Sequence, residues 1–147
     1  MKKALFAMGI AAALTLGLTS CQHQTMETMD VTIRGGSNGY YGDWTALADG
    51  SLICSVQWDE LDEDVVDFGS VNAYYLDGSR QHPLPYIIPV AYTETDTNGQ
   101  PYDYYVGENL RFDFKYGEIT FILQDLDGEA ISGDLGDMTI RVVAVGD

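Results

Sequence analysis

The sequence has few basic residues: 7 Lys and Arg stand against 23 Asp and Glu in 147 residues, a formal net charge of −16. Such a chain lacks the positive surface that binds nucleic-acid phosphates, and it has no electrostatic attraction to anionic lipids. The acidity does not indicate disorder, because 46% of the residues are hydrophobic and 12% are aromatic, which is enough for a buried core. The length is that of one domain.

Cysteine and histidine are also scarce, with two of each. His23, His82 and Cys54 have no zinc-ligand spacing and make a poor nucleophilic site, and the sequence contains no Gly-x-Ser-x-Gly elbow. Cys54 lies on the apolar face of an alternating segment, where a free cysteine is usually an inert hydrophobic residue. We therefore expect no catalytic residues and no cofactor. A hydrolase built on two carboxylates is the third alternative, since some pair among 23 acids will lie at a suitable distance by chance.

The long hydrophobic run Ala4–Leu18 follows the basic start Met1-Lys2-Lys3. This layout is typical of a secretory signal peptide, and the run is short for a spanning helix, which needs about 20 residues. Its end, Leu18-Thr19-Ser20-Cys21, resembles the lipobox of bacterial lipoproteins. The resemblance implies cleavage before Cys21, a diacylglycerol on the Cys21 thiol and usually an acyl chain such as palmitate on the new amino group. Gln22 favours the outer membrane.

Three regions follow from this interpretation: a signal peptide at 1–20, a lipidated cysteine with a polar tether at 21–29, and one domain at 30–147. Cys54 would then have no intramolecular disulfide partner, although the export route permits disulfides. The mature chain would be more acidic still, because Lys2 and Lys3 belong to the signal.

Within the domain, hydrophobic residues recur at every second position. This period is typical of β-strands, and the segments that show it are 31–34, 52–58, 71–76, 111–116, 119–124 and 138–145. The dipeptides Asp49-Gly50, Asp77-Gly78 and Asn98-Gly99 favour hairpin turns. One helical turn near Glu60–Val66 is the best helix candidate. The pattern predicts an all-β, antiparallel β-sandwich of about eight or nine strands, immunoglobulin-like or jelly-roll-like.

The segment His82–Val90 has three prolines at odd positions, 83, 85 and 89. In an extended chain their missing N–H groups would face one side, which favours an edge strand with its proline side open. The alternative is a docking surface of prolines and aromatic rings.

Aromatic and acidic clusters supply the candidate ligand-binding residues. In Tyr40-Tyr41-x-x-Trp44 and in Tyr102-x-Tyr104-Tyr105, neighbouring rings lie on opposite faces of a strand, so one of each pair should face outward and could bind a ligand. The alternative is that tyrosine is there as a strand former. Asp125, Asp127 and Glu129 are weak calcium candidates, because an EF-hand alignment would place Leu123 at the first ligand position. The other acidic run, Asp59–Asp67, lacks the loop glycine, and we interpret both runs chiefly as solvated turns.

Several segments in order resemble a family of small uncharacterised lipoproteins of the Bacteroidetes. Residues 60–76 (ELDEDVVDFGSVNAYYL) are similar to its block I-T-x-D-V-V-D-N-G-A-V-L-V-Y, with Phe68 in place of the usual Asn. Pro83-Leu84-Pro85-Tyr86 is similar to its L-P-Y element, Thr139–Val145 to its closing F-R-V-V-V-I strand, and Trp44 to an early Trp. The resemblance implies a β-sandwich on the cell envelope and a short turn or helix at the acidic run, and it supplies no catalytic residues.

These observations predict an exported outer-membrane lipoprotein, facing the periplasm or the cell surface, held by lipid on Cys21 and acting as a non-catalytic binding module for a glycan or a protein. An envelope assembly component is the runner-up; it would pair strands with a partner through the proline-rich edge or the terminal strand. No nucleic-acid partner is expected.

Overall fold

The structure, a computed structural model, describes residues 24–131 and 134–146 of the chain. The regular secondary structure of the described part is almost all strand; the strands are β1 (Thr25–Ile33), β2 (Thr45–Ala46), β3 (Leu52–Gln57), β4 (Ser70–Asp77), β5 (Arg80–Pro83), β6 (Tyr86–Thr95), β7 (Pro101–Lys115), β8 (Glu118–Asp125) and β9 (Met138–Gly146). A π-helical turn, η1 (Asp64–Phe68), links β3 to β4 and confirms the short helix predicted near Glu60–Val66, shifted toward the C-terminus.

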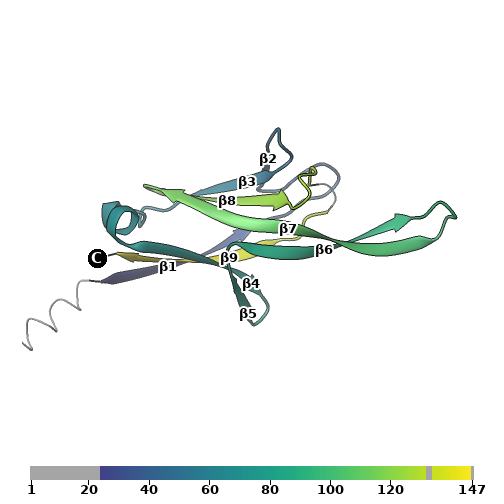
Figure 1. Cartoon of the computed structure of the whole chain (residues 1–147). Helices are drawn as coiled ribbons and strands as arrows, with labels where there is room; N and C mark the ends of the chain where they lie inside the picture. The colour runs from purple at the N-terminus through teal and green to yellow at the C-terminus, as the bar shows by residue number, and fades with distance from the viewer. Residues whose placement is uncertain (1–23, 132–133, 147) are drawn as a thin grey trace, which may run out of the picture.

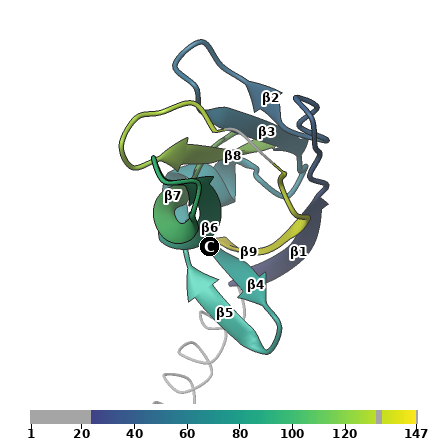
Figure 2. The same cartoon turned by 90° about the vertical axis from the view of Figure 1, so that its right-hand side faces the viewer.

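The strands form two antiparallel sheets packed as a sandwich (Figures 1 and 2). One sheet has the order β1-β9-β4-β5 and the other β2-β3-β8-β7-β6. The predicted fold class, an antiparallel β-sandwich of about nine strands, is confirmed. The predicted turn dipeptides are confirmed as well: Asp49-Gly50 lies between β2 and β3, Asp77-Gly78 between β4 and β5, and Asn98-Gly99 between β6 and β7.

The hydrophobic side chains that recur at every second position fill the space between the sheets. Ile140 and Val142 of β9 and Phe121 and Leu123 of β8 are fully buried, while their sequence neighbours Arg141 and Thr120 are partly exposed. The same alternation buries Leu52 of β3 and Ala73 of β4. Burial of a large side chain such as Leu52 or Phe121 stabilises a fold by roughly 1.5–3 kcal/mol.

Strand β1 begins at Thr25, earlier than the predicted domain boundary at residue 30. Thr25 lies opposite Gly146 and Met29 opposite Val142, so residues 25–29 are part of the sheet and not of a tether. The alternation rule missed them because a backbone ladder at a sheet edge does not require buried side chains, and Met26 is 70% exposed. The predicted signal peptide and Cys21 lie outside the described residues.

The structure differs from the prediction that the proline-rich segment His82–Val90 is one extended strand. Strand β5 ends at Pro83, the Leu84–Pro85 peptide bond is cis, and β6 begins at Tyr86 in the other sheet. The predicted edge location is confirmed, because β5 and β6 are the edge strands of their sheets. Proline cannot donate to a ladder, and the break between the two strands lies at Pro83 and Pro85, whereas Pro89 is accommodated inside the edge strand β6.

The terminal strand β9 lies inside its sheet, between β1 and β4. Both of its edges are paired, with Ile140 opposite Val31 on one side and Tyr75 on the other. The version of the assembly hypothesis in which the terminal strand pairs with a partner is therefore wrong for the folded domain.

The β6–β7 hairpin extends well beyond the sandwich (Figure 1). Its ladder continues from the pair Tyr86–Leu110 to the pair Thr95–Pro101, whereas β8 pairs with β7 only as far as Glu108. The hairpin tip is closed by the Asp96 carboxylate, which accepts hydrogen bonds from the N–H groups of Asn98 and Gln100, both at 2.8 Å. The start of β1, the end of β9 and η1 lie at the opposite end of the domain (Figure 1).

Candidate functional site

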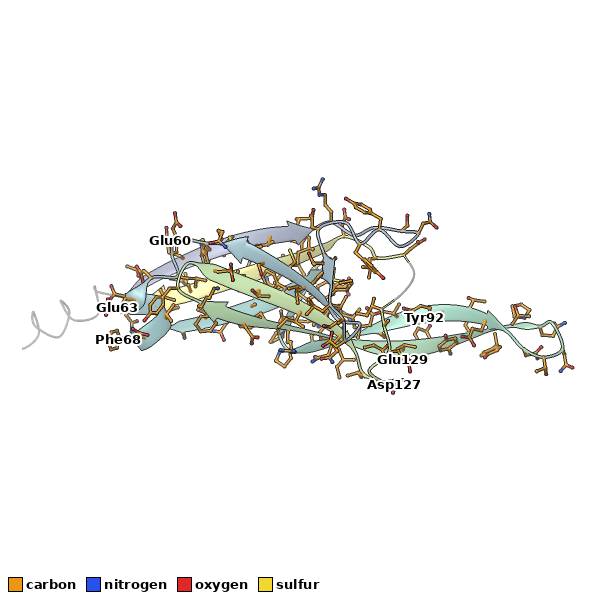
Figure 3. The ribbon with its side chains drawn as sticks, turned by 90° about the horizontal axis from the view of Figure 1, so that it is seen from above. Glu60, Glu63, Phe68, Tyr92, Asp127 and Glu129 are labelled. Atoms are coloured by element: carbon orange, nitrogen blue, oxygen red, sulfur yellow. The ribbon has the colours of Figure 1, made fainter. Side chains whose placement is uncertain are left out.

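A groove of about 450 Å³ lies where the hairpin leaves the sandwich. One wall comes from β6 and β7 and the other from the end of β8 and the segment after it, as Figure 3 shows for Tyr92, Asp127 and Glu129. The lining residues are Tyr92, Thr93, Glu94, Tyr104, Val106, Asp125, Asp127, Glu129, Ala130 and Ile131. A smaller cavity of about 180 Å³ shares Tyr92 with the groove and is lined by Glu108.

The groove continues the inner face of the sheet beyond the core. Val90 lies opposite Val106 and Tyr92 opposite Tyr104 in the ladder, so these four side chains share one face of the hairpin. Two residues before Val90, Ile88 packs against the core on the same face. Beyond the end of β8 no further strand lies beside β7 among the described residues, and on this face tyrosines take the place of buried aliphatic side chains.

The tyrosines form a row along the hairpin. The ring centroids of Tyr92 and Tyr104 are 5.8 Å apart in a stacked arrangement, and those of Tyr104 and Tyr102 are 6.1 Å apart. The hydroxyl groups of Tyr102 and Tyr104 each donate a hydrogen bond of 2.9 Å to the Glu94 carboxylate. These two bonds lower the pKa of Glu94, and the bond to Glu94 raises the pKa of both tyrosines. The rings are therefore held by stacking and by one shared anion.

Glu108 marks the boundary between core and groove. Its side chain is only 2% exposed, and it lies opposite Asp125 in the β7–β8 ladder. The Tyr92 hydroxyl donates a hydrogen bond of 3.4 Å to Glu108. Burial raises the pKa of the Glu108 carboxyl group; the bond from Tyr92 opposes this shift, and the charge of Asp125 adds to it. The site thus keeps a carboxyl group away from water, next to a second one.

The segment after β8 forms the acidic wall. Asp125 Oδ1 accepts hydrogen bonds from the N–H groups of Asp127, at 2.8 Å, and Glu129, at 3.4 Å, so this carboxylate organises the turn. The Ile131 N–H donates to the Gly50 carbonyl at 3.2 Å. The exposed carboxylates of Asp127 and Glu129 remain available at the groove.

The calcium candidates Asp125, Asp127 and Glu129 all line this groove. Among the described residues, however, no group of three or more His, Cys, Asp or Glu side chains is arranged so that it could hold a metal ion.

Of the six aromatic candidates, Tyr102 and Tyr104 belong to the row beside the groove, and Tyr104 lines the groove itself. Tyr105 is 75% exposed and projects from the other face of the hairpin, as expected for a neighbour in a strand. The two predicted clusters do not form one aromatic surface.

The other three candidates lie between β1 and β2. Tyr40 is 71% exposed, while Tyr41 packs against the core and its hydroxyl donates to the Ile131 carbonyl at 3.3 Å. Trp44 is only 5% exposed and belongs to the core, so its assignment to a binding surface is wrong. Burial of so large an apolar ring stabilises the fold more than its exposure would. Tyr41 supports the groove indirectly, through Ile131.

Sequence reasoning missed Tyr92, Glu94 and Glu108. The signal was present, because Tyr86, Ile88, Val90 and Tyr92 alternate with period two, but Pro89 interrupts the run. Glu108 carried no signal of burial, since a lone acid between Gly107 and Asn109 is typical of a solvated position.

The remaining chemistry-bearing residues serve the fold. Burial raises the pKa of the Cys54 thiol, with a further contribution from the Asp43 carboxylate, so its reactive thiolate form is disfavoured. His82 stacks on Tyr86, with ring centroids 4.2 Å apart, and both rings lie near Tyr75 where the chain crosses between the sheets. These half-buried rings join the two sheets, whereas Pro83, Pro85 and Pro89 of the same segment are exposed.

The charge around the groove has one sign. None of its lining residues is Lys or Arg, and four of them are carboxylates. The chain has no Lys or Arg from residue 81 to 110, which includes most of the hairpin, and none from 116 to 140, which includes β8 and the acidic wall. The groove therefore lies in a region of negative potential.

Comparison of the chain with protein-family models, curated proteins and solved structures finds no match. These comparisons therefore supply no ligand, and the groove is the structural feature that bears on function.

Proposed function

We propose that the protein is a lipid-anchored lipoprotein of the bacterial outer membrane that acts as a non-catalytic binding module, with a glycan or a protein bound in the groove beside Tyr92 and Tyr104. The observation that carries this proposal is the aromatic groove itself, an uncovered continuation of the inner face. Such a surface combines apolar ring area with a few polar groups, which is the usual composition of a binding site.

The position of the groove supports the same proposal. Strand β1 starts at Thr25, four residues after Cys21, at the end of the domain opposite to the hairpin (Figure 1). A lipid on Cys21 would hold that end at the membrane and direct the groove away from it. Among the described residues no helix is long and apolar enough to cross a membrane.

Catalysis is supported less well than binding. The two opposed carboxyl groups at the site are Glu108 and Asp125, and burial of Glu108 to 2% exposure withholds it from a substrate in the groove. A general acid must reach the atom it protonates within hydrogen-bond distance.

Binding can be tested with the full-length protein purified in detergent. We would screen it on a glycan array and against envelope extract, in parallel with Tyr104→Leu and with Tyr105→Leu as a matched control on the outer face of the hairpin. Ligands of the groove should be lost with Tyr104→Leu and retained with Tyr105→Leu. Ligands that survive both substitutions, or are lost equally with both, would contradict the assignment of the groove.

Membrane attachment has a separate test. Cys21→Ala should move the protein from the membrane fraction to the soluble fraction, because the acidic domain has no attraction to anionic lipid. Persistence of the variant in the membrane fraction would refute lipidation as the anchor.

The edge strand β6 favours a second candidate function, assembly by strand pairing. β6 pairs with β7 along its full length of 10 residues, and its other edge has no partner strand among the described residues. Chemical cross-linking in cells should then recover a stoichiometric partner through cysteines placed on β6, whereas a monomer without cross-links would exclude this function.

A further inference from the structure

We propose that the ligand of the groove is a cationic polypeptide segment, a stretch of chain rich in arginine and lysine. This inference rests on the proposed function in one respect, namely that the groove is the ligand site. It adds the chemical class of the ligand.

Charge complementarity is the first argument. Glu94, Asp125, Asp127 and Glu129 line one groove of about 450 Å³ with no basic residue among the lining. The exposed carboxylates of Asp127 and Glu129 have no basic residue near them in the sequence, since the chain lacks Lys and Arg from 116 to 140. An anionic glycan would be repelled here, and a neutral one would gain nothing from the charge. A cation gains from both walls of the groove.

The tyrosines are the second argument. Arginine and lysine side chains are attracted to the faces of aromatic rings within about 6 Å of the ring centre. The hydroxyl group of Tyr92 is bound to Glu108 and that of Tyr104 to Glu94, so the orientation of both rings is fixed before a ligand arrives. A site that is already ordered loses less conformational entropy on binding.

The shape of the site favours a chain over a small amine. The row of rings continues along the hairpin from Tyr92 through Tyr104 to Tyr102, and Tyr102 is 47% exposed. The site is therefore extended along a two-stranded ribbon and flanked by a turn, which suits several successive side chains of a peptide better than one compact group.

The test uses the full-length protein in detergent and three fluorescein-labelled ten-residue peptides, in which serine alternates with arginine, with glutamine or with glutamate. Fluorescence anisotropy should detect binding of the arginine peptide alone, and the affinity should fall as salt is raised. The Asp127→Asn/Glu129→Gln variant should bind the arginine peptide about fivefold more weakly, since each exposed ion pair contributes a modest amount. Tyr104→Leu should weaken binding about fivefold, and Tyr104→Phe should keep most of the affinity because the ring face remains.

The matched control is Glu60→Gln/Glu63→Gln, which removes the same charge from exposed residues at the far end of the domain (Figure 3). This variant should bind the arginine peptide as the unaltered protein does. An equal loss in both double variants would overturn the proposal, because binding would then follow net charge and not the groove. Melting curves confirm that each variant is folded.

The outcomes separate this inference from the proposed function. If no arginine peptide binds, yet a ligand from the glycan or extract screen is lost with Tyr104→Leu, the groove is a binding site for another class of ligand and only the cationic inference fails. If neither the peptide nor any screened ligand responds to Tyr104→Leu, the groove is not a binding site and both proposals fail.

Discussion

The two halves of the β6–β7 hairpin share one ladder but differ in what covers them. In the covered half, next to β8, Leu110 is fully buried and Ile88 packs against the core. In the uncovered half the same inner face bears Tyr92, Tyr104 and Tyr102, with Tyr102 47% exposed. Tyrosine keeps the strand propensity and the cross-strand contacts while its hydroxyl group stays solvated or bound. One half stabilises the fold, and the other is the half to which we assign the proposed binding site.

The largest effect is expected in the covered half. Leu110→Ala should lower the free energy of unfolding by about 2–5 kcal/mol, because it removes a fully buried side chain and leaves a cavity. Tyr105→Ala, at a position 75% exposed on the outer face of the hairpin, should change it by no more than about 0.5 kcal/mol. Urea denaturation of both variants measures the contrast, and equal losses would mean that the hairpin folds as one uniform element.

The packing of the groove wall after β8 can be tested at Gly50. Its φ is +86°, and an added Cβ would lie 2.7 Å from the Cα of Ala130 in the groove wall. The control is Gly78, with φ +57° and open space around it. We expect Gly78→Ala to cost about 1 kcal/mol from backbone strain alone, and Gly50→Ala to cost about 1–3 kcal/mol more because the segment must shift. Equal costs in thermal unfolding would show that the wall is not packed on Gly50.

At the boundary between the two halves, Glu108→Gln should change how stability depends on pH. The folded-state pKa of Glu108 is raised, so the folded protein holds this proton more tightly than the unfolded chain. Its contribution to stability therefore falls as the pH rises from the ordinary carboxyl pKa through the raised one. The Gln variant should lose this slope and be the more stable protein at neutral pH. Denaturation curves across this pH range would contradict the assignment if the two slopes are the same.

The smallest effect is expected in the uncovered half. The pKa of Glu94 is lowered by Tyr102 and Tyr104, so its contribution is present above the ordinary carboxyl pKa and is lost as the pH falls through the lowered one. Glu94→Gln should leave the global unfolding midpoint unchanged and speed amide hydrogen exchange only near the hairpin tip. Faster exchange in β8 would show instead that the two halves are coupled.

The sequence was sufficient for the sandwich because buried and exposed positions alternate wherever a strand covers a core, as in β8 and β9. It was insufficient where backbone pairing or proline, and not the burial of alternate side chains, determines the structure. Thr25–Glu27 extend β1 with exposed side chains, so only the backbone ladder with β9 shows their place in the sheet, and the prolines divide one predicted strand between two sheets. At the groove, Tyr104 could be named from its neighbours. Tyr92 belongs to a period-two run that Pro89 interrupts, and only the register of the ladder brings Tyr92 and Glu94 beside Tyr104.

The central position of β9 also bears on how the domain folds. The Asp30–Arg141 contact between β1 and β9 joins residues 111 positions apart, so the four-stranded sheet cannot form until β9 reaches β1 and β4. Contacts over such separations place folding on the order of milliseconds to seconds. During that interval β1 has an unpaired edge on both sides, and protection against aggregation then depends on the mutual repulsion of a strongly acidic chain.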